Sequence, residues 1–531
     1  MTTVAASPAG LSMRAGWLLM GGIVLASLTE AIAGTVLSLG RGDIMGDTYA
    51  TPDAFAWLDV GYTAFKLIGF AFAPWILARI QPRTALLAAT LVMGAACALA
   101  SATTQIDLLI LLRAIQGLAG AILLVGGQVI LFLAYPRPSQ PLVQAIFAMG
   151  AVVAPATLAP MLHGWFLDNQ SWTWIFFSVL PLSLAAAGLM LMSDLLASVE
   201  VESPRFDWIG FALLSMALFF VTYVLSQGSR WNWFEESRIV WLSLAGGTCL
   251  LLFIVQQRRV GGGTLFDLTV FRTDDFTFAF VVSFVAGAAL FGSAYLIPAF
   301  AVSVLGFTPT DAGQLLLPSG ALFAGALLLA AWLMQGRGLS PIATVPFGIL
   351  LIMAAMWMLS GSSGESGAGD MMPAVLLRGL GLGFLFLSIT LIAFNALPRA
   401  ILASGIALFN IGRQLGGLIG VAGLQTAIDQ QVAASQTVLG SALNPGAPAV
   451  AERLASTVSL LAGRGMDPGS TARAAAAMLG RAVRSEATVI AFDTAFMLVA
   501  LLFVAAAPLI VGLKIALKRR RQRLDMAGAG A

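Results

Sequence analysis

Charged residues are scarce in this chain of 531 residues: only 10% are charged, whereas 59% are hydrophobic. So little charge cannot cover the surface of a water-soluble domain with polar side chains. The composition therefore excludes a soluble globular protein and predicts an integral membrane protein whose main partner is the lipid bilayer.

Cysteine and histidine are equally rare, and this excludes several kinds of site. Cys97 and Cys249 both fall in apolar stretches, so the sequence indicates neither a disulfide framework nor a thiolate metal site. His163 is the single histidine, which argues against zinc or haem. We therefore expect no metal and no cofactor.

Long apolar runs dominate the chain instead. Runs of roughly 20 apolar residues, the length that crosses about 30 Å of hydrocarbon, recur from Gly16 to Leu513, and we count about 14 of them. They must be helices, because no backbone amide can stay unpaired in lipid. The expected spans are 15–39, 54–79, 84–103, 107–135, 141–165, 173–193, 207–226, 238–256, 276–303, 311–335, 341–360, 371–397, 403–428 and 489–514.

This order predicts an all-α polytopic protein in three parts. Residues 1–195 form an N-terminal six-helix bundle, and residues 196–256 form two inserted transmembrane helices. Residues 257–531 form a C-terminal six-helix bundle with an external loop at 430–488 and a basic cytoplasmic tail.

Arginine is unevenly distributed among the loops, which predicts the orientation. The loops on one side carry Arg79, Arg83, Arg137, Arg205, Arg258, Arg259, Arg272, Arg337 and Arg399, and the short loops on the other side carry only Arg41, Arg230 and Arg238. By the positive-inside rule both termini are cytoplasmic. A basic tail could also bind nucleic acid or anionic lipid, but we interpret it as a topology signal and expect no nucleic-acid partner.

Three arginines lie inside apolar spans, where a charge costs about 3 kcal/mol or more and usually persists because function needs it. They are Arg113, Arg378 and Arg413. The first two lie in matching text, LLRAIQGLAG and LLRGLGLGFL, which is typical of a chain built from two related halves. A duplicated helical bundle with buried charge predicts a transporter.

Arg113 shares one helix face with Gln116 and Gly117. A buried arginine could merely tie helices together through backbone carbonyls. Alternatively, it favours the ionised form of a nearby carboxylate, and its depth in the membrane points to Glu30 or Asp59. A membrane carboxylate that binds either a proton or a cationic substrate is the simplest exchange device.

A second polar face comprises Asp59, Tyr62 and Lys66, at positions i, i+3 and i+7 of one span. Asp59 and Lys66 are two turns apart, so each needs another partner or water. Lys66 could hold an anionic substrate group, lose its proton, or form an ion pair. His163 is a candidate proton sensor because histidine ordinarily titrates near neutral pH, although a lone buried histidine is more often a satisfied polar contact.

The stretch from Gln430 to Ser485 is alanine-rich and carries spaced arginines, with a Met-Asp-Pro-Gly break at Met466. We expect two short amphipathic helices outside the membrane. They either pack on the outer rim as a lid or dock a partner protein.

Together these motifs resemble the major facilitator superfamily, in particular its 14-helix drug/proton antiporter branch of the EmrB and QacA type. The most specific match is AMGAVVAPATLAPMLHGWFLDNQSWTWIFFSVLP, which contains Pro155, Pro160 and Gly164 and is similar to the antiporter motif and the following SWRWIF signature. RAIQG at Arg113, RGLGLGF at Arg378 and GRQLGGLIGVAG, which contains Arg413, are further similarities.

The resemblance implies a fold of two six-helix bundles plus two extra helices, driven by the proton gradient. It implies that Glu30, with Asp59, carries the proton and that Arg113 tunes it. We expect Tyr62, Lys66, Gln116, His163 and Arg413 to line the substrate cavity, and the conformational motifs to include Arg79, Arg83, Gly117, Pro155, Pro160, Gly164 and Arg378. One departure is Ala78, which stands where the gating motif of the family has an aspartate.

The predicted function is proton-coupled efflux of amphipathic small molecules by alternating access, in a bacterial inner membrane. The alternative is a dedicated metabolite or siderophore exporter that works with a periplasmic adaptor through residues 430–488. An enzyme would need a nucleophile and a base that converge, and a receptor would need a cytoplasmic domain. The sequence indicates neither, so we expect no enzymatic activity.

Overall fold

The computed structural model describes residues 13–38, 40–193, 206–260, 268–443 and 447–529. Within these ranges the chain is helical and has no strands, and fourteen helical segments are long and apolar enough to cross a membrane. The predicted all-α polytopic fold class is therefore confirmed.

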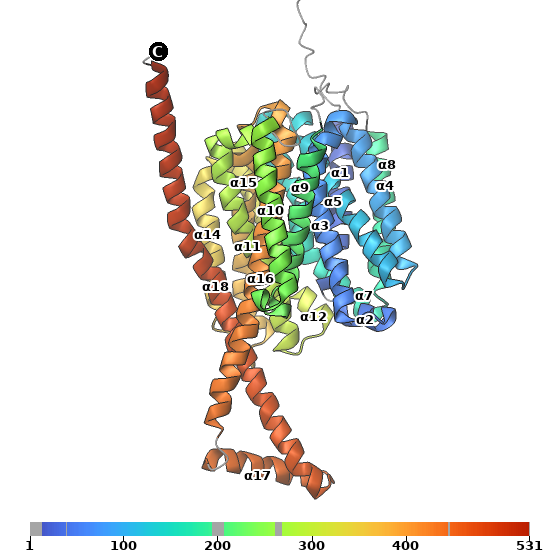
Figure 1. The fold of residues 1–531 in the computed structure, drawn as a ribbon, viewed down its shortest axis with the longest axis vertical. Helices are drawn as coiled ribbons and strands as arrows, with labels where there is room; N and C mark the ends of the chain where they lie inside the picture. Colours follow the sequence, from blue (N-terminus) through green and yellow to red (C-terminus); the bar gives the residue numbers. More distant parts are fainter. Residues whose placement is uncertain (1–12, 39, 194–205, 261–267, 444–446, 530–531) are drawn as a thin grey trace, which may run out of the picture.

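The first half of the chain forms one helical group (Figure 1). Its helices are α1 (Met13–Thr35), α2 (Arg41–Thr48), α3 (Pro52–Arg79), α4 (Pro82–Ser101), α5 (Ile106–Ala134), α6 (Gln140–Ala148), α7 (Ala159–Asn169) and α8 (Thr173–Met192). A π-helical segment, Met149–Leu158, joins α6 to α7 as one continuous span. It contains Pro155, which has no backbone N–H to donate to the regular helical ladder.

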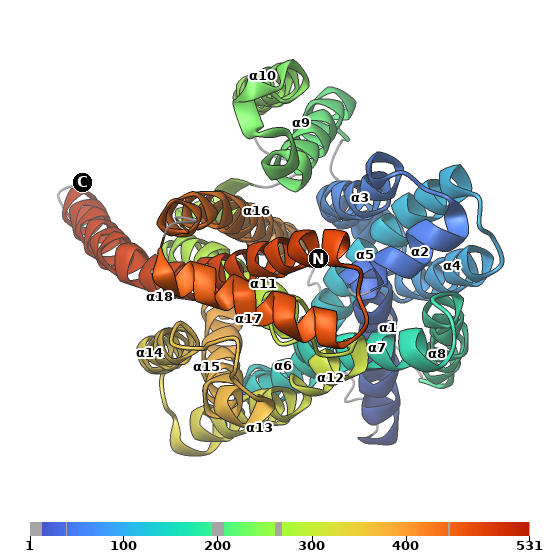
Figure 2. The same cartoon turned by 90° about the horizontal axis from the view of Figure 1, so that it is seen from below.

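The second half forms a matching group (Figure 2). Its helices are α11 (Asp274–Ser303), α12 (Pro309–Gln314), α13 (Leu317–Arg337), α14 (Pro341–Leu359), α15 (Ala368–Asn395), α16 (Leu402–Ala442), α17 (Pro448–Gly463) and α18 (Pro468–Ala529). Helix α15 packs on α13 and α14 as α5 packs on α3 and α4, and α18 packs on α11 and α14 as α8 packs on α1 and α4. The repeated text around Arg113 and Arg378 thus occupies equivalent helices.

Two further helices, α9 (Trp208–Gln227) and α10 (Ser237–Val260), lie outside both groups, beside α3 and α16 (Figure 2). The turn between them contacts both halves. Ser229 donates to Asp429 Oδ2 of α16 at 2.8 Å, and Arg230 forms an ion pair with Asp53 of α3 at 2.8 Å. The inserted pair therefore spans the outer edge of the contact between the halves.

The expected spans at 403–428 and 489–514 are only parts of longer helices. Helix α16 continues to Ala442 and α18 begins at Pro468, so both run far past the bundle, with α17 across their ends (Figure 1). We call residues 430–485, apart from 444–446, the stalk. Hydropathy predicts which part of a helix lies in lipid. Outside the lipid the alanine-rich sequence continues the helix, because alanine has a high helix propensity.

The predictions of two short separate helices and of a lid on the outer rim are therefore wrong for the stalk. It points away from the bundle on the side opposite to that where α1 begins and α18 ends (Figure 1). We call these the stalk side and the terminal side. A short helix that the sequence did not predict, α2, lies on the stalk side and is held by Trp172, which donates to Asp47 Oδ2 at 2.8 Å.

Close helix contacts within each half depend on glycine. A Cβ on Gly117 of α5 would lie 2.2 Å from the carbonyl oxygen of Tyr62 of α3. A Cβ on Gly416 of α16 would lie 2.0 Å from the carbonyl oxygen of Phe284 of α11. Small residues let transmembrane backbones approach this closely, and these two contacts set the helix spacing in the interior of each half.

Replacing Gly117 by valine should destabilise the protein, because the new side chain would push α5 away from α3. We expect a loss of about 1–3 kcal/mol, as for other overpacked cores, seen as a lower melting temperature of the purified protein in detergent. Gly188→Val is the control, since a Cβ there has no atom within 4 Å. Equal melting temperatures for the two variants would contradict this account of the α3–α5 contact.

Candidate functional site

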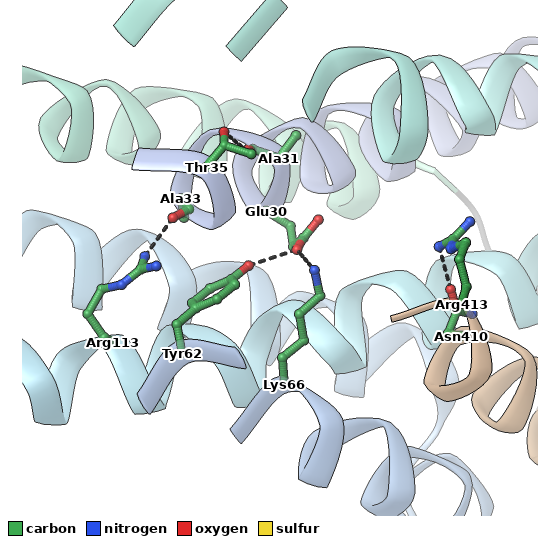
Figure 3. Close-up of polar contacts among 9 residues, drawn as sticks. All are labelled: Glu30, Ala31, Ala33, Thr35, Tyr62, Lys66, Arg113, Asn410 and Arg413. Atoms are coloured by element: carbon green, nitrogen blue, oxygen red, sulfur yellow. Dashed lines mark hydrogen bonds and ion pairs between the residues drawn. The ribbon is translucent and has the colours of Figure 1, made fainter. Parts of the chain in front are cut away.

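Glu30, in the second half of α1, is the centre of a buried polar cluster (Figure 3). Only 3% of its surface is exposed. Its Oε1 accepts a hydrogen bond from the Tyr62 hydroxyl at 2.7 Å and forms an ion pair with Lys66 Nζ. Tyr62 and Lys66 lie one turn apart on α3, so one face of that helix supplies both partners.

The space for this cluster comes from two glycines. A Cβ on Gly34 of α1 would lie 2.8 Å from the Tyr62 hydroxyl, and a Cβ on Gly120 of α5 would lie 2.8 Å from Glu30 Cγ. Either side chain would displace a member of the cluster. Glycine at these positions therefore positions the carboxylate among three helices.

Arg113 of α5 joins the cluster through an aromatic ring and not through an ion pair. Its guanidinium lies over the Tyr62 ring, 4.2 Å from the ring centroid, in a cation–π contact. Its Nη1 donates to the carbonyl oxygen of Ala33 at 2.6 Å and to Gln116 Oε1 at 3.1 Å. Tyr62 thus bridges Arg113 and Glu30, while the arginine also ties α5 to the backbone of α1.

Two other predicted residues lie apart from Glu30. The Asp59 side chain is exposed and makes no hydrogen bond or ion pair within the described residues, although Arg113 is close enough to attract it. His163 of α7 is completely buried against the backbone of Ile32 and Thr35 in α1. The three residues of the predicted face therefore do not act together: Tyr62 and Lys66 contact Glu30, and Asp59 does not.

A small cavity lies between the two halves. Its volume is about 20 Å³, enough for one water molecule. Its lining comes from α5, α6 and the π-helical segment on one side and from α15 and α16 on the other: Leu124, Gln128, Gln144, Phe147, Ala148, Val152, Thr390, Asn410 and Arg413. Of the predicted cavity residues, the structure places only Arg413 there.

The uncharged polar residues of this cavity were not predicted from the sequence. Gln128 Nε2 donates to Gln144 Oε1 at 3.2 Å, and Gln144 Nε2 donates to Gln140 Oε1 at 3.2 Å. Gln140 in turn donates to the carbonyl oxygen of Tyr135 at 2.9 Å, at the terminal side. Their sequence signal is glutamine and asparagine inside apolar runs, which stand out there as the arginines do.

Among the predicted conformational residues, Arg79 and Arg83 make no ion pair within the described part of the chain. Arg79 lies over the Trp75 ring, 5.1 Å from its centroid. Arg83 Nη2 donates to the carbonyl oxygens of Met190 and Leu191, at 3.0 and 3.1 Å. Ala78 offers no carboxylate here, and Arg83 uses the carbonyl end of α8 as its acceptor.

The segment around α7 forms a tight contact between the halves on the stalk side. A Cβ on Gly164 would lie 2.4 Å from the carbonyl oxygen of Pro309, where α12 begins, and a Cβ on Gly313 of α12 would lie 2.7 Å from the carbonyl oxygen of Pro160.

In the second half, Arg378 is fully buried and donates from Nε to Ser293 Oγ at 2.7 Å. Its position in α15 matches that of Arg113, and neither arginine forms an ion pair within the described residues.

Comparison with known proteins places these features in a family. The family model described as Major Facilitator Superfamily matches residues 19–421. The colistin resistance protein EmrB of Acinetobacter baumannii is 23% identical over 453 residues, which cover 83% of this chain and 86% of that protein. The multidrug export protein EmrB of Escherichia coli is 23% identical over 427 residues, or 80% and 82% of the two chains. The fatty acid resistance protein FarB of Neisseria gonorrhoeae is 23% identical over 489 residues, or 92% and 94%.

The Glu30–Lys66 pair should make a measurable contribution to stability. Lys66→Met leaves a buried carboxylate without its counter-charge, and breaking a buried pair in this way typically costs about 3–5 kcal/mol. We expect a lower melting temperature for Lys66→Met in detergent at about pH 8, where a carboxylate in the unfolded chain is ionised. Lys66→Arg, which keeps the charge, should remain closer to wild type.

The double variant Glu30→Gln/Lys66→Met tests the same pair from the other direction. Because it removes both charges together, its melting temperature should recover most of the loss seen for Lys66→Met. The single variant Glu30→Gln completes the comparison. If the loss of stability in the double variant equals the sum of the losses in Glu30→Gln and Lys66→Met, Glu30 and Lys66 do not interact energetically.

Proposed function

The chain belongs to the major facilitator superfamily, and from this premise we propose that it exports amphipathic small molecules in exchange for protons across a bacterial inner membrane. The observation that carries the proposal is the buried Glu30 carboxylate, held by Lys66 and Tyr62 at the meeting point of three helices. An ionisable group kept inside a membrane bundle is costly and is usually part of an ion pathway. The named relatives include exporters and resistance proteins, which is consistent with export.

In this proposal the proton competes with Lys66 for Glu30. When the carboxylate is ionised, the ammonium group holds α3 to α1; when the carboxylate takes up a proton, this attraction disappears. Arg413, in the other half of the molecule, is also attracted by the charge of Glu30. Protonation therefore changes the force across the contact between the halves, which is what a carrier needs in order to alternate between two conformations.

The contact between the halves supplies the two gates of this cycle. On the stalk side, α7 and α12 pack backbone to backbone around Gly164 and Gly313. On the terminal side, the Phe132 ring of α5 meets the Phe394 ring of α15 at 5.5 Å between centroids. Rocking of the halves would open one contact while the other stays closed, with the cavity between them as the substrate site.

The orientation follows from the loop arginines. The terminal side carries most of them, so we assign that side to the cytoplasm, with both termini, and the stalk side to the periplasm. Substrate would then enter the cavity past Phe132 and leave past the α7–α12 contact.

The test is reconstitution in liposomes that contain a trapped pH dye, with an imposed proton gradient and a panel of lipophilic cations, neutral aromatics and organic anions. We expect proton movement on addition of a transported compound, and its loss in Glu30→Gln. Glu235→Gln, in an exposed turn, is the matched control and should behave as wild type. Proton movement that persists in Glu30→Gln would remove Glu30 from the pathway and shift the proposal to Asp59 or His163.

A second candidate function, a dedicated exporter that delivers a metabolite or siderophore to a periplasmic adaptor, is favoured by the stalk. In the proposed orientation the stalk stands in the periplasm, yet it exposes 68% of Val438, 56% of Leu460 and 47% of Met478. A contiguous exposed apolar patch marks a protein interaction site, and the adaptor proposal requires that these three side chains form one. An adaptor that covers them would carry the substrate onward from the stalk side.

Replacement of Val438, Leu460 and Met478 by serine separates the two functions. If an adaptor docks on the stalk, the triple variant should lose most export from intact cells but keep wild-type exchange in proteoliposomes. Ser441→Ala/Ser456→Ala, also on the exposed stalk surface, is the control. Wild-type export by the triple variant in cells would argue against an adaptor that binds here.

A further inference from the structure

Arg413 places a positive charge at the contact between the halves without a counter-charge beside it. The ion pairs in the described residues join Lys66 to Glu30 and Arg230 to Asp53, so no described carboxylate oxygen lies within 4.0 Å of the Arg413 guanidinium. Glu30 attracts Arg413 from a distance, but its carboxylate is already occupied by Lys66 and Tyr62 (Figure 3). A charge in the interior of a membrane bundle normally has a partner.

The guanidinium also has unused hydrogen-bonding capacity. It carries five N–H donors, and its one hydrogen bond within the described chain is from Nη2 to Asn410 Oδ1 at 2.6 Å. Asn410 is buried and is itself held to the carbonyl oxygen of Ile406 at 2.8 Å. Asn410 therefore fixes one edge of the guanidinium and leaves the remaining donors for another acceptor.

The rest of the cavity lining is neutral, and it comes from both halves. Gln128 and Gln144 contribute amide groups from the first half, and Thr390 contributes a hydroxyl from the second half. No acidic residue is part of the described lining, and Leu124 and Phe147 supply apolar walls. A cation surrounded by neutral donors and acceptors, next to apolar surface, matches a ligand with one negative head group and an apolar body.

We infer that this cavity recognises amphipathic monoanions, with Arg413 binding the anionic head group and the two glutamines approaching it from the opposite half. The inference rests on the proposed export function and specifies its substrate class. The cavity of about 20 Å³ is too small for such a ligand as it stands, so the halves separate to admit it. Cations are disfavoured, because Lys66 already occupies the buried carboxylate that would attract them.

Equilibrium binding to purified protein in nanodiscs tests the inference with three probes of one shape: naphthoate, naphthalenemethanol and naphthylmethylammonium, followed by their own fluorescence anisotropy. Wild type should bind naphthoate most tightly. Arg413→Gln should weaken naphthoate binding by about tenfold or more and change naphthalenemethanol binding by less than about twofold, since only the charged head group loses its partner.

Two further variants separate recognition from folding. Arg413→Lys keeps the positive charge without the planar donor set, so it should retain part of the preference for naphthoate. Arg337→Gln removes an exposed arginine at the end of α13 and should change nothing. If Arg413→Gln does not fold, a preference for naphthoate that is weaker in Arg413→Lys than in Arg337→Gln gives the same answer.

The inference is overturned if wild type binds the neutral or cationic probe at least as tightly as naphthoate, or if Arg413→Gln weakens all three probes alike. Binding needs no proton gradient, so this result is independent of the coupling proposal. Naphthoate binding that depends on Arg413, in a protein that moves no protons, would support the anion site and contradict proton-coupled export. Proton movement driven by cations alone would support proton-coupled export and contradict the anion site.

Discussion

The constraint on which the structure depends is the free-energy cost of keeping charge inside a membrane. Glu30 and Lys66 neutralise each other across the α1–α3 contact, and the Tyr62 hydroxyl donates to the same carboxylate oxygen that Lys66 contacts. This arrangement needs α1, α3 and α5 to pack closely, which Gly34, Gly117 and Gly120 permit. The interior glycines and the charged residues therefore depend on each other, because the ion pair forms only where the backbones of these helices can approach closely.

The three arginines in the membrane spans meet this cost with different partners, and Arg113 Nη2 and both Nη atoms of Arg378 have no hydrogen-bond partner in the described residues. Arg113 uses a tyrosine ring and a backbone carbonyl, Arg378 uses a serine hydroxyl, and Arg413 uses an asparagine and the edge of a cavity. They differ in location: Arg113 is packed inside one half, whereas Arg413 lies at the contact between the halves. Only the last is placed where the relative movement of the halves would change its surroundings.

Much of the fold could be predicted from the sequence because membrane insertion depends on local composition. The fourteen apolar segments, the two inserted helices and the similarity of the halves all follow from runs of residues that are contiguous in the chain. Helix ends were predicted less well. The helices α16 and α18 extend into the stalk because hydropathy marks the edge of the lipid and not the end of a helix, and the π-helical segment before α7 has no signature in the apolar pattern.

The sequence by itself identified Glu30, Lys66 and the three arginines as charges inside apolar spans, but it marked Asp59 in the same way, and that side chain is exposed. Only the tertiary structure decided how they pair. Glu30 binds Lys66 and not Arg113, Asp59 is left apart, and Arg413 faces the other half through a cavity that also contains glutamines from α5 and α6. The physical reason is that pairing depends on the rotation and crossing of helices distant in sequence. Those are set by glycine contacts and side-chain packing summed over the whole bundle, and no local pattern records them.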